Sequence, residues 1–552
     1  MKLKFSYSLI AISLVVMTSL LSFDSPNDRY FDIAKNMEIF TSVYSEVNRY
    51  YVDDVDPNEM MKKGIESMLA SLDPYTNYIP EDKIEDFRFI STGQYGGIGA
   101  VIGNRDDKIM ILMPYEGFPA HKSGLIIGDE IVEINGVNVK GKTTSDISDL
   151  LKGQAETKVD VKIKRYGKDA LLPIEIIREK ITVESVPYFG MLNEDVGYFK
   201  LNSFTDNATK DIEKALKALK EKGAKKFVFD LRGNTGGLLN EAIGIANLFI
   251  EKGKEVVSTR GKVEKWNATH VAQNPAFDVT SPLIILTNDR SASASEIVSG
   301  VIQDYDRGIL VGRQTYGKGL VQATMGLVHN AQLKVTTAKY YIPSGRCIQA
   351  IDYSNKDDKG KAKKIPDSLL VAFKTANGRT VYDGAGILPD IEVELPDASD
   401  VLEALVEKNI LFDYATKYYY SHPTIAPAKE FVLADTEYND FVKWVNDNNL
   451  EYKITSQKYL EDFAEEIDND SILNVDFSTE IEAMRLKLEA KKKEALYTFK
   501  QEIVEYLESE ICSRYYLQNG IIEASFNHDP DLKKALELLN NPSEYNKILV
   551  KK

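Results

Sequence analysis

The chain has 552 residues, of which 43% are hydrophobic, enough apolar material for several separate cores. Its net charge of −16 repels nucleic acid and gives no general attraction to anionic lipid, so we expect no nucleic-acid partner. The two cysteines, Cys347 and Cys512, lie far apart without metal-ligand spacing, so the sequence predicts neither a disulfide framework nor a zinc site. We expect no metal and no cofactor.

Residues 1–24 have the charge and hydropathy order of an export signal. Lys2 and Lys4 precede an apolar run that is interrupted only by serines and a threonine. No A-x-A cleavage site is clear and no cysteine follows the run, so the segment is either removed or kept as a single inner-membrane anchor. The sequence therefore predicts a periplasmic or otherwise extracytoplasmic protein.

Residues 25–90 predict a small helical domain, because apolar residues recur there at helical spacing. Residues 91–180 change to short β-type runs divided by glycine, with one helix over 145–151, and predict a compact β domain. In its "YGGIGAVI" segment, the amides of Gly97, Ile98 and Gly99 can bind a carboxylate, and the strand edge beyond can accept a peptide. By pattern alone, an ordinary β domain with glycine turns is an equal alternative.

Residues 181–397 alternate strand and helix, which predicts an α/β core. The runs "FVFDL", "PLIILT" and "GILVG" are typical of parallel strands that are covered on both faces. They lead into a glycine loop (232–237), a serine loop (288–296) and a lysine loop (313–319), which should meet at one rim of the sheet. Residues 398–552, the extension, predict charged helices with solvated faces.

The serine loop contains the candidate nucleophile. Ser293 and Glu296 have the S-x-x-E spacing of a capping box, which places Ser293 at the strand-to-helix corner, facing the rim. The amide of Ala294 can then face the oxygen that becomes negative during attack on a carbonyl, and Gly236 or Gly237 can supply a second donor. Taken alone, a serine at such a position more often caps a helix than catalyses.

Lys318 is the candidate general base, flanked by two glycines that leave its amine room to reach the serine. A serine needs a base, and a lysine acts as one only where burial lowers its pKa from about 10.4 to about 7 or 8. Without the serine loop on the same rim, Lys318 would be an ordinary turn lysine. A histidine base is a further alternative, since His270 and His329 bracket the serine loop in the sequence.

Residues 312–319 also match the glycine and lysine spacing of a phosphate-binding loop. Gly319 replaces the hydroxyl residue that would bind magnesium, and the following "LVQATMGLV" predicts a strand where such loops precede a helix. The sequence therefore disfavours a nucleotide-binding enzyme.

Several motifs resemble one known family. They are "LDPYTNYI", "GGIGAVI", "FVFDLRGNTGGLLNEAI", "SASASEIVSGVIQDYDRGILVGRQTYGKGLVQ", "YYIPSGRCIQ" and "GILPDIEV", in the order found in C-terminal processing peptidases, or tail-specific proteases. The resemblance covers residues 30–396. It implies a multidomain α/β fold: a crotonase/ClpP-like protease core with an inserted PDZ domain, an N-terminal helical domain and a mainly helical C-terminal extension. It also implies Ser293 as nucleophile and Lys318 as general base.

Further roles rest on the resemblance alone. It implies that Gln322 orients Lys318, with a solvent-facing strand residue as the alternative. It implies that Asp304 supports the site without transferring a proton, with a helix-end ion pair as the alternative. The PDZ domain would capture a free C-terminal carboxylate and an apolar last side chain through residues 97–99. Arg178 would couple this capture to activity, unless it forms a structural ion pair.

The predicted function is therefore a serine endopeptidase that cleaves unfolded or tagged proteins near their C-termini without a cofactor. The alternative is a catalytically inactive PDZ scaffold that only holds protein tails. The resemblance says nothing firm about the extension, for which adaptor binding, assembly into a homo-oligomer and control of access stay open.

Overall fold

The computed structural model describes residues 26–357, 360–448, 453–469 and 476–550. The chain divides into two compact units, Met1–Tyr78 and Ile79–Lys552. The predicted export segment lies outside the described residues. Within the residues described, no helix combines the length and the apolar character needed to cross a bilayer.

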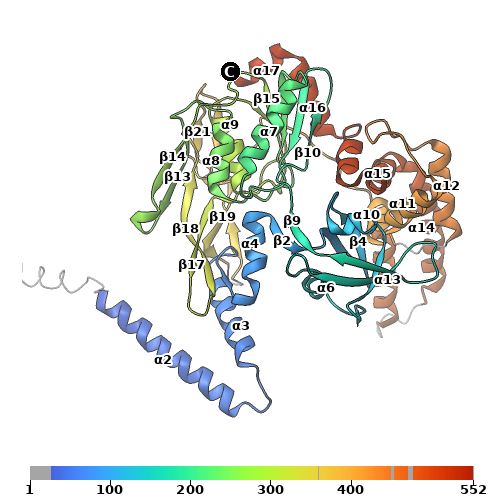
Figure 1. The fold of residues 1–552 in the computed structure, drawn as a ribbon, viewed down its shortest axis with the longest axis horizontal. Coiled ribbons are helices and arrows are strands. Elements are labelled where there is room, and N and C mark those ends of the chain that lie inside the picture. The colour runs from blue at the N-terminus through green and yellow to red at the C-terminus, as the bar shows by residue number, and fades with distance from the viewer. Residues whose placement is uncertain (1–25, 358–359, 449–452, 470–475, 551–552) are drawn as a thin grey trace, which may run out of the picture. The chain divides into compact units, whose positions relative to one another are not determined.

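The N-terminal unit is helical, as the spacing of its apolar residues predicts. Its described helices are α2 (Pro26–Tyr50) and α3 (Pro57–Ala70), both drawn in Figure 1. Asp56 caps α3, because its carboxylate accepts hydrogen bonds from the backbone N–H groups of Asn58 and Glu59. A proline at the first helical position also favours the start of this helix.

The β domain contains a six-stranded antiparallel sheet in the order β3-β4-β5-β7-β8, with β6 beside β5. The strands are β3 (Ala100–Arg105), β4 (Lys108–Pro114), β5 (Glu130–Ile134), β6 (Val137–Asn138), β7 (Lys158–Lys164) and β8 (Leu172–Ile177). The helices before and within the domain are α4 (Ile84–Thr92), α5 (Pro119–Lys122) and α6 (Thr144–Leu151). Helix α6 confirms the helix that the sequence predicts over 145–151.

Two short strands close the β domain where the chain enters and leaves it. They are β2 (Gln94–Gly97) and β9 (Glu179–Thr182), which pair antiparallel. The glycine-rich segment therefore begins at the junction with the α/β core.

The α/β core is built on a sheet in the order β10-β11-β12-β15-β16-β23. Its strands are β10 (Tyr188–Met191), β11 (Val196–Lys200), β12 (Lys226–Asp230), β15 (Leu283–Thr287), β16 (Ile309–Gly312) and β23 (Ile391–Glu392). Every neighbouring pair from β11 to β23 is parallel, whereas β10 is antiparallel to β11. The parallel order of β12, β15 and β16 is confirmed, so the glycine, serine and lysine loops begin at the same edge.

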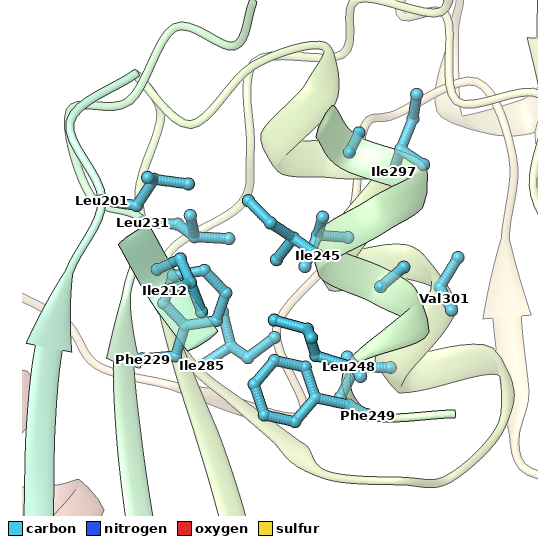
Figure 2. Packing of buried hydrophobic residues seen from close by; sticks show 14 of the residues in the cluster. Leu201, Ile212, Phe229, Leu231, Ile245, Leu248, Phe249, Ile285, Ile297 and Val301 are labelled. Atoms are coloured by element: carbon cyan, nitrogen blue, oxygen red, sulfur yellow. The ribbon is translucent and has the colours of Figure 1, made fainter. Parts of the chain in front are cut away.

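Three helices cover one face of this sheet: α7 (Ala208–Glu221), α8 (Leu239–Asn247) and α9 (Ala294–Asp304). Figure 2 shows Phe229 and Ile285 of the sheet packed against side chains of these helices. Successive residues of a strand point to opposite faces of the sheet. The residues next to Phe229 and Ile285 in the sequence therefore face the other side of this sheet.

The other face is covered by the C-terminal end of the chain, helices α16 (Pro530–Asn540) and α17 (Pro542–Leu549). Val228 and Ile284 pack there against Leu538 and other apolar residues. The red helices lie beside β10 and β15 in Figure 1. Burial of both faces is confirmed, and the extension completes the core rather than forming a detached domain.

A second, antiparallel sheet contains β13 (Glu255–Gly261), β14 (Ala268–Val271), β17 (Leu320–Gly326) and β18 (Gln332–Tyr341). Two further strand pairs are β19 (Ile351–Lys356) with β20 (Ala362–Lys364), and β21 (Ala372–Lys374) with β22 (Thr380–Tyr382). The lysine loop runs from β16 of the first sheet into β17 of the second.

The first part of the extension is helical, as predicted, and encloses its own apolar core. Its helices are α10 (Asp400–Glu407), α11 (Ile410–Ser421), α12 (Asp435–Asp447), α13 (Thr455–Asn469), α14 (Ser478–Thr498) and α15 (Lys500–Ser525). Helix α15 bends at Leu517, which has a φ of +52°. The extension also contacts the β domain, where the Arg105 guanidinium lies over the Phe412 ring.

Leu538→Ala should lower the free energy of unfolding by about 2–5 kcal/mol, because the truncated side chain leaves a cavity under the core sheet. Lys533→Ala, at an exposed position of the same helix, is the control and should change stability by less than about 0.5 kcal/mol. Thermal and urea unfolding measure both variants. An equally small effect for both would show that α16 is not part of the core.

Candidate active site

Ser293 lies directly before α9, at the strand-to-helix corner that the capping pattern predicts. Its φ of +56° and ψ of −111° are far from the extended conformation of an ordinary N-cap residue. Strain of this kind is concentrated at functional sites, and catalytic serines occupy such sharp turns between a strand and a helix. The backbone therefore distinguishes Ser293 from a simple cap.

The neighbouring serines have structural partners. The Ser291 hydroxyl donates to the Leu231 carbonyl at 2.9 Å, and the Ser295 hydroxyl donates to the Asn234 carbonyl at 2.9 Å. These two bonds fasten the serine loop to the glycine loop and to the residue directly before it. Ser293 remains the candidate nucleophile among the three.

The Glu296 carboxylate joins the serine loop to the lysine loop. Its Oε2 accepts hydrogen bonds from the backbone N–H groups of Ser293, at 2.8 Å, and Lys318, at 2.9 Å. Its Oε1 accepts from the Thr315 hydroxyl, at 2.6 Å, and from the Gly317 N–H, at 2.7 Å. One oxygen atom thus connects the backbones of the predicted nucleophile and the predicted base.

Glu296 is completely buried, and its backbone N–H partners favour the ionised form. Three of its four donors are backbone N–H groups, and the fourth, the Thr315 hydroxyl, also accepts a hydrogen bond from the Ile387 N–H at 2.7 Å. Burial raises the pKa of Glu296, and the four donors oppose that rise. Because all four acceptor positions are taken, a protonated carboxyl would lose at least one of these bonds.

Lys318 is partly buried, and the glycines beside it serve the packing of the lysine loop. A Cβ on Gly317 would lie 2.4 Å from the Ala350 Cβ, and one on Gly319 would lie 2.8 Å from the Gln349 nitrogen. The Ala350 N–H donates to the Gly317 carbonyl at 2.9 Å, and the Gly319 N–H donates to Gln349 Oε1 at 2.8 Å. The glycines let the loop lie directly against residues 349–350.

The glycine loop lies directly against Ser293. Gly236 has a φ of +102°, and a Cβ there would lie 2.9 Å from the Ser293 Cβ and 3.0 Å from the Ala294 nitrogen. The Gly236 N–H donates to Asn234 Oδ1 at 2.9 Å, so it is already engaged within its own loop. Of the predicted oxyanion donors, we therefore keep Ala294 and Gly237 as the stronger candidates.

Gln322 lies on β17, four residues after Lys318. Its Nε2 donates to the Thr336 hydroxyl on the neighbouring strand β18 at 3.2 Å. Its proposed role in orienting the lysine stays a prediction.

Asp304 is the last residue of α9, at the opposite end of that helix from Ser293. Its carboxylate pairs with the buried Arg346 guanidinium at 2.9 Å and accepts a hydrogen bond from the Ser344 N–H at 2.9 Å. This is the helix-end ion pair that the sequence left open as the alternative. The supporting role of Asp304 in the active site stays a prediction.

In the β domain, the glycine-rich segment turns backbone amides toward a tyrosine. Gly97 ends β2, Ile98 is buried, and Gly99 has a φ of +73°. The backbone amides of Gly99 and Ala100 face the Tyr95 phenol oxygen closely enough to lower its pKa. Burial raises the pKa of Tyr95, so this hydroxyl is neutral. The sequence pattern did not indicate that the Ala100 amide and the Tyr95 side chain belong to this segment's binding geometry. A pattern of residues shows neither how the chain bends nor which side chain faces the bend.

Arg178 follows β8 and fastens the end of α6. Its guanidinium donates to the carbonyls of Leu150 and Leu151, both at 2.9 Å. It also donates to the Lys158 carbonyl at 3.1 Å and the Thr157 hydroxyl at 3.0 Å. These partners are uncharged, so within the described part of the chain the contacts do not form the ion pair that the sequence left open. The coupling role of Arg178 stays a prediction.

The structure gives no support to a histidine base or to a phosphate-binding loop, the two alternatives that the sequence raised for this site. His329 is exposed in the turn between β17 and β18, and His270 lies on β14, an end strand of the second sheet. The lysine loop leads into strand β17, as predicted, whereas a phosphate-binding loop leads into a helix.

Comparison with known proteins identifies the family. The model of peptidase family S41 matches residues 195–355, which include Ser293 and Lys318. A carboxy-terminal-processing protease of Bartonella bacilliformis is 36% identical over 346 residues, 62% of this chain and 78% of the relative. The chain belongs to peptidase family S41. This S41 protein is a serine-type peptidase, which confirms the family resemblance.

Other matches cover the remaining domains of the S41 chain. A PDZ domain model matches residues 111–165, and a model of the C-terminal helical domain of probable PDZ-proteases matches residues 401–539. These matches confirm the predicted fold class. The carboxy-terminal processing protease CtpA of Bacillus subtilis is 31% identical over 377 residues, 67% of this chain and 77% of the relative. A solved photosystem II D1 C-terminal processing protease is 25% identical, with a TM-score of 0.36, and the match covers 64% of this chain and 92% of that one.

Glu296→Gln should lower kcat by about 100-fold or more, because an amide nitrogen would face N–H donors and the two loops would shift by a fraction of an ångström. KM for a disordered protein substrate should stay within about twofold. Glu221→Gln, at an exposed position on α7, is the matched control. Steady-state cleavage measures both, and full activity of Glu296→Gln would contradict the role given to this carboxylate.

Proposed function

We propose that this S41 peptidase hydrolyses peptide bonds near the C-termini of unfolded or tagged proteins, with Ser293 as nucleophile and Lys318 as general base. The observation that carries the proposal is the buried Glu296 carboxylate, one oxygen of which accepts hydrogen bonds from the backbones of both residues. The strained backbone of Ser293 supports it independently.

In the proposed acylation step, the neutral Lys318 amine takes the Ser293 hydroxyl proton while Oγ attacks the carbonyl carbon of the scissile bond. The amides of Ala294 and Gly237 donate hydrogen bonds to the resulting oxyanion. Collapse of the tetrahedral intermediate breaks the C–N bond, and the lysine returns its proton to the leaving amine. The product is an ester on Ser293, and Gln322 is the proposed partner that orients the lysine amine.

Deacylation repeats these roles with water as the nucleophile. Lys318 takes a proton from water as the water oxygen attacks the ester carbon. Collapse of the second intermediate breaks the bond to Ser293 Oγ, which recovers the proton from the lysine. The carboxylate product leaves, and both residues return to their initial protonation states.

The PDZ domain is the proposed site of tail recognition. The substrate carboxylate would take the place of the Tyr95 phenol oxygen at the amides of Gly99 and Ala100, next to the predicted Gly97 and Ile98. An apolar last side chain would lie near residues that are only partly buried against the domain core, namely Ala100, Ile102 and Leu150. Arg178 fastens the nearby helix α6 and is the proposed link between tail binding and activity.

The proposed location is outside the cytoplasm. It rests on residues 1–24, whose basic start and apolar run are typical of an export signal or single anchor. Membrane association, in this proposal, is through that segment alone.

Ser293→Ala should lower cleavage of a disordered protein by at least about 1000-fold, while binding of its C-terminal tail is retained. Mass spectrometry of the products from one substrate with a free and an amidated C-terminus measures cleavage and carboxylate recognition together. Cleavage that persists in the variant would assign a different nucleophile. A wild-type protein that binds the tail without cutting it would support the inactive scaffold instead.

Tyr95→Phe should tighten binding of a peptide with a free C-terminal carboxylate several-fold, corresponding to about 1 kcal/mol. The reason is that the Gly99 and Ala100 amides would no longer have a phenol oxygen to exchange for the carboxylate. Fluorescence anisotropy of a labelled peptide measures this, with Tyr166→Phe, an exposed tyrosine of the same domain, as control. Weaker binding would show that the Tyr95 hydroxyl itself binds the tail.

A further inference from the structure

A cluster of charged residues lies where the glycine loop and the lysine loop leave the core sheet. Arg232 begins the glycine loop, two residues after the end of β12, and Arg313 begins the lysine loop, directly after β16. Gly236, four residues after Arg232, lies against Ser293. Lys318 is five residues after Arg313. The two arginines therefore stand at the bases of the two loops that surround the nucleophile.

The carboxylates that bind Arg232 come partly from the extension. Its Nη1 donates to Asp529 Oδ1 and Asp531 Oδ2, both at 2.9 Å, and its Nη2 donates to Asp529 Oδ2 at 2.6 Å. Its Nε donates to Asp230 Oδ1 at 3.0 Å, and Nη2 also to Asp230 Oδ2 at 2.7 Å. All the donor atoms of the guanidinium are thus engaged, and three carboxylates determine its position.

Asp531 connects both loops. Its Oδ2 accepts the hydrogen bond from Arg232 and lies 3.7 Å from Arg313 Nη1. The Asp531 side chain is only 1% exposed, so these interactions are weakly screened by solvent. One carboxylate of the extension therefore contacts the bases of both loops. The base of the glycine loop lies almost three hundred residues earlier in the chain, and the base of the lysine loop more than two hundred.

The two aspartates are themselves held rigidly. Asp529 caps α16, since its Oδ1 accepts a hydrogen bond from the Leu532 N–H at 3.0 Å, and Asp531 lies in the first turn of the helix. Acidic residues are favoured at this end of a helix because of its dipole. Leu532 and Leu538 anchor the same helix on the core sheet.

The charges of the cluster balance. Arg232, Arg313 and Lys200 face Asp230, Asp529 and Asp531, with Lys200 Nζ 3.4 Å from Asp230 Oδ2. Burial alone would raise the pKa of Asp230, but Arg232 and Lys200 hold it well below its usual range. Removing one buried carboxylate would leave a guanidinium without its full set of partners, so the loop base would shift to find others.

We propose that Asp529 and Asp531 are positioning residues for catalysis, which hold the bases of the glycine and lysine loops at the spacing that the active site needs. The extension would then act on the chemistry itself and not only on access or assembly. The catalytic part of this inference rests on the proposed function of Ser293 and Lys318. The structural part, that the two aspartates hold the bases of the two loops in place, does not.

The test compares Asp531→Asn in the full chain with Glu537→Gln, a carboxylate on the same helix whose side chain is 61% exposed. Asp531→Asn should lower kcat for a disordered substrate by about 10- to 100-fold, with KM and tail affinity within about twofold. Asp531→Glu, which keeps the charge, should restore part of the loss. Glu537→Gln should leave all three quantities unchanged.

Hydrogen exchange followed by mass spectrometry tests the structural part without any activity. Amides of the glycine loop and the lysine loop should exchange faster in Asp531→Asn than in the wild type, and those of the β domain should not. If Asp531→Asn does not fold, Arg313→Gln takes its place, because the Arg313 side chain is 29% exposed. This variant should also lower kcat, and the amides of the lysine loop should exchange faster.

Unchanged kcat and unchanged exchange in the folded variant would overturn the proposal. A loss of tail affinity equal to the loss of kcat would also overturn it, because it would indicate a general disturbance of the fold. If the wild-type protein itself does not cleave, the proposed function fails, whereas the exchange measurement still decides whether the extension holds the two loops.

Discussion

The active site depends on a buried negative charge, the Glu296 carboxylate, which hydrogen-bond donors stabilise. Glu296 accepts four hydrogen bonds, from Ser293, Thr315, Gly317 and Lys318. Removing a carboxylate from water is costly unless it is fully hydrogen-bonded, so the loops have to bring all four donors together for the fold to tolerate it. The requirement to satisfy this charge therefore sets the register between the serine loop and the lysine loop.

The parallel sheet makes this arrangement possible. Because β12, β15 and β16 run in the same direction, their carboxyl ends place three loops side by side at one edge. The loops are then held from two directions. On one side, Glu296 connects the serine and lysine loops; on the other, the first turn of α16 meets the bases of the glycine and lysine loops. Core packing and catalytic geometry thus share the same elements.

Much of the core could be predicted from the sequence because its signals are local. The apolar runs predicted the strands of the core sheet, and the capping pattern predicted the position of Ser293 before a helix. The segment after Gly319 has the pattern of a strand, which is β17. Each of these signals spans a few residues, and each depends on backbone geometry that neighbours in sequence determine. The family resemblance then added the roles of the residues, which local patterns do not contain.

The contacts that define the site are long-range, and the pattern of residues does not show them. The capping box explained one bond of Glu296, but its bonds to residues about twenty positions later depend on how the lysine loop folds back. In the same way, an amphipathic pattern in α16 shows that one face is buried without showing that the core sheet covers it. The engagement of the Gly236 amide by Asn234 is likewise visible only in three dimensions.

The most direct test of this account is the separation of Ser293 Oγ and Lys318 Nζ in a crystal structure of the wild-type enzyme with a bound substrate peptide. The account predicts a hydrogen-bond distance, about 2.6–3.2 Å, with Glu296 still bound to the backbones of both residues. A lysine amine that points into solvent, out of reach of the serine while the peptide occupies the site, would contradict it.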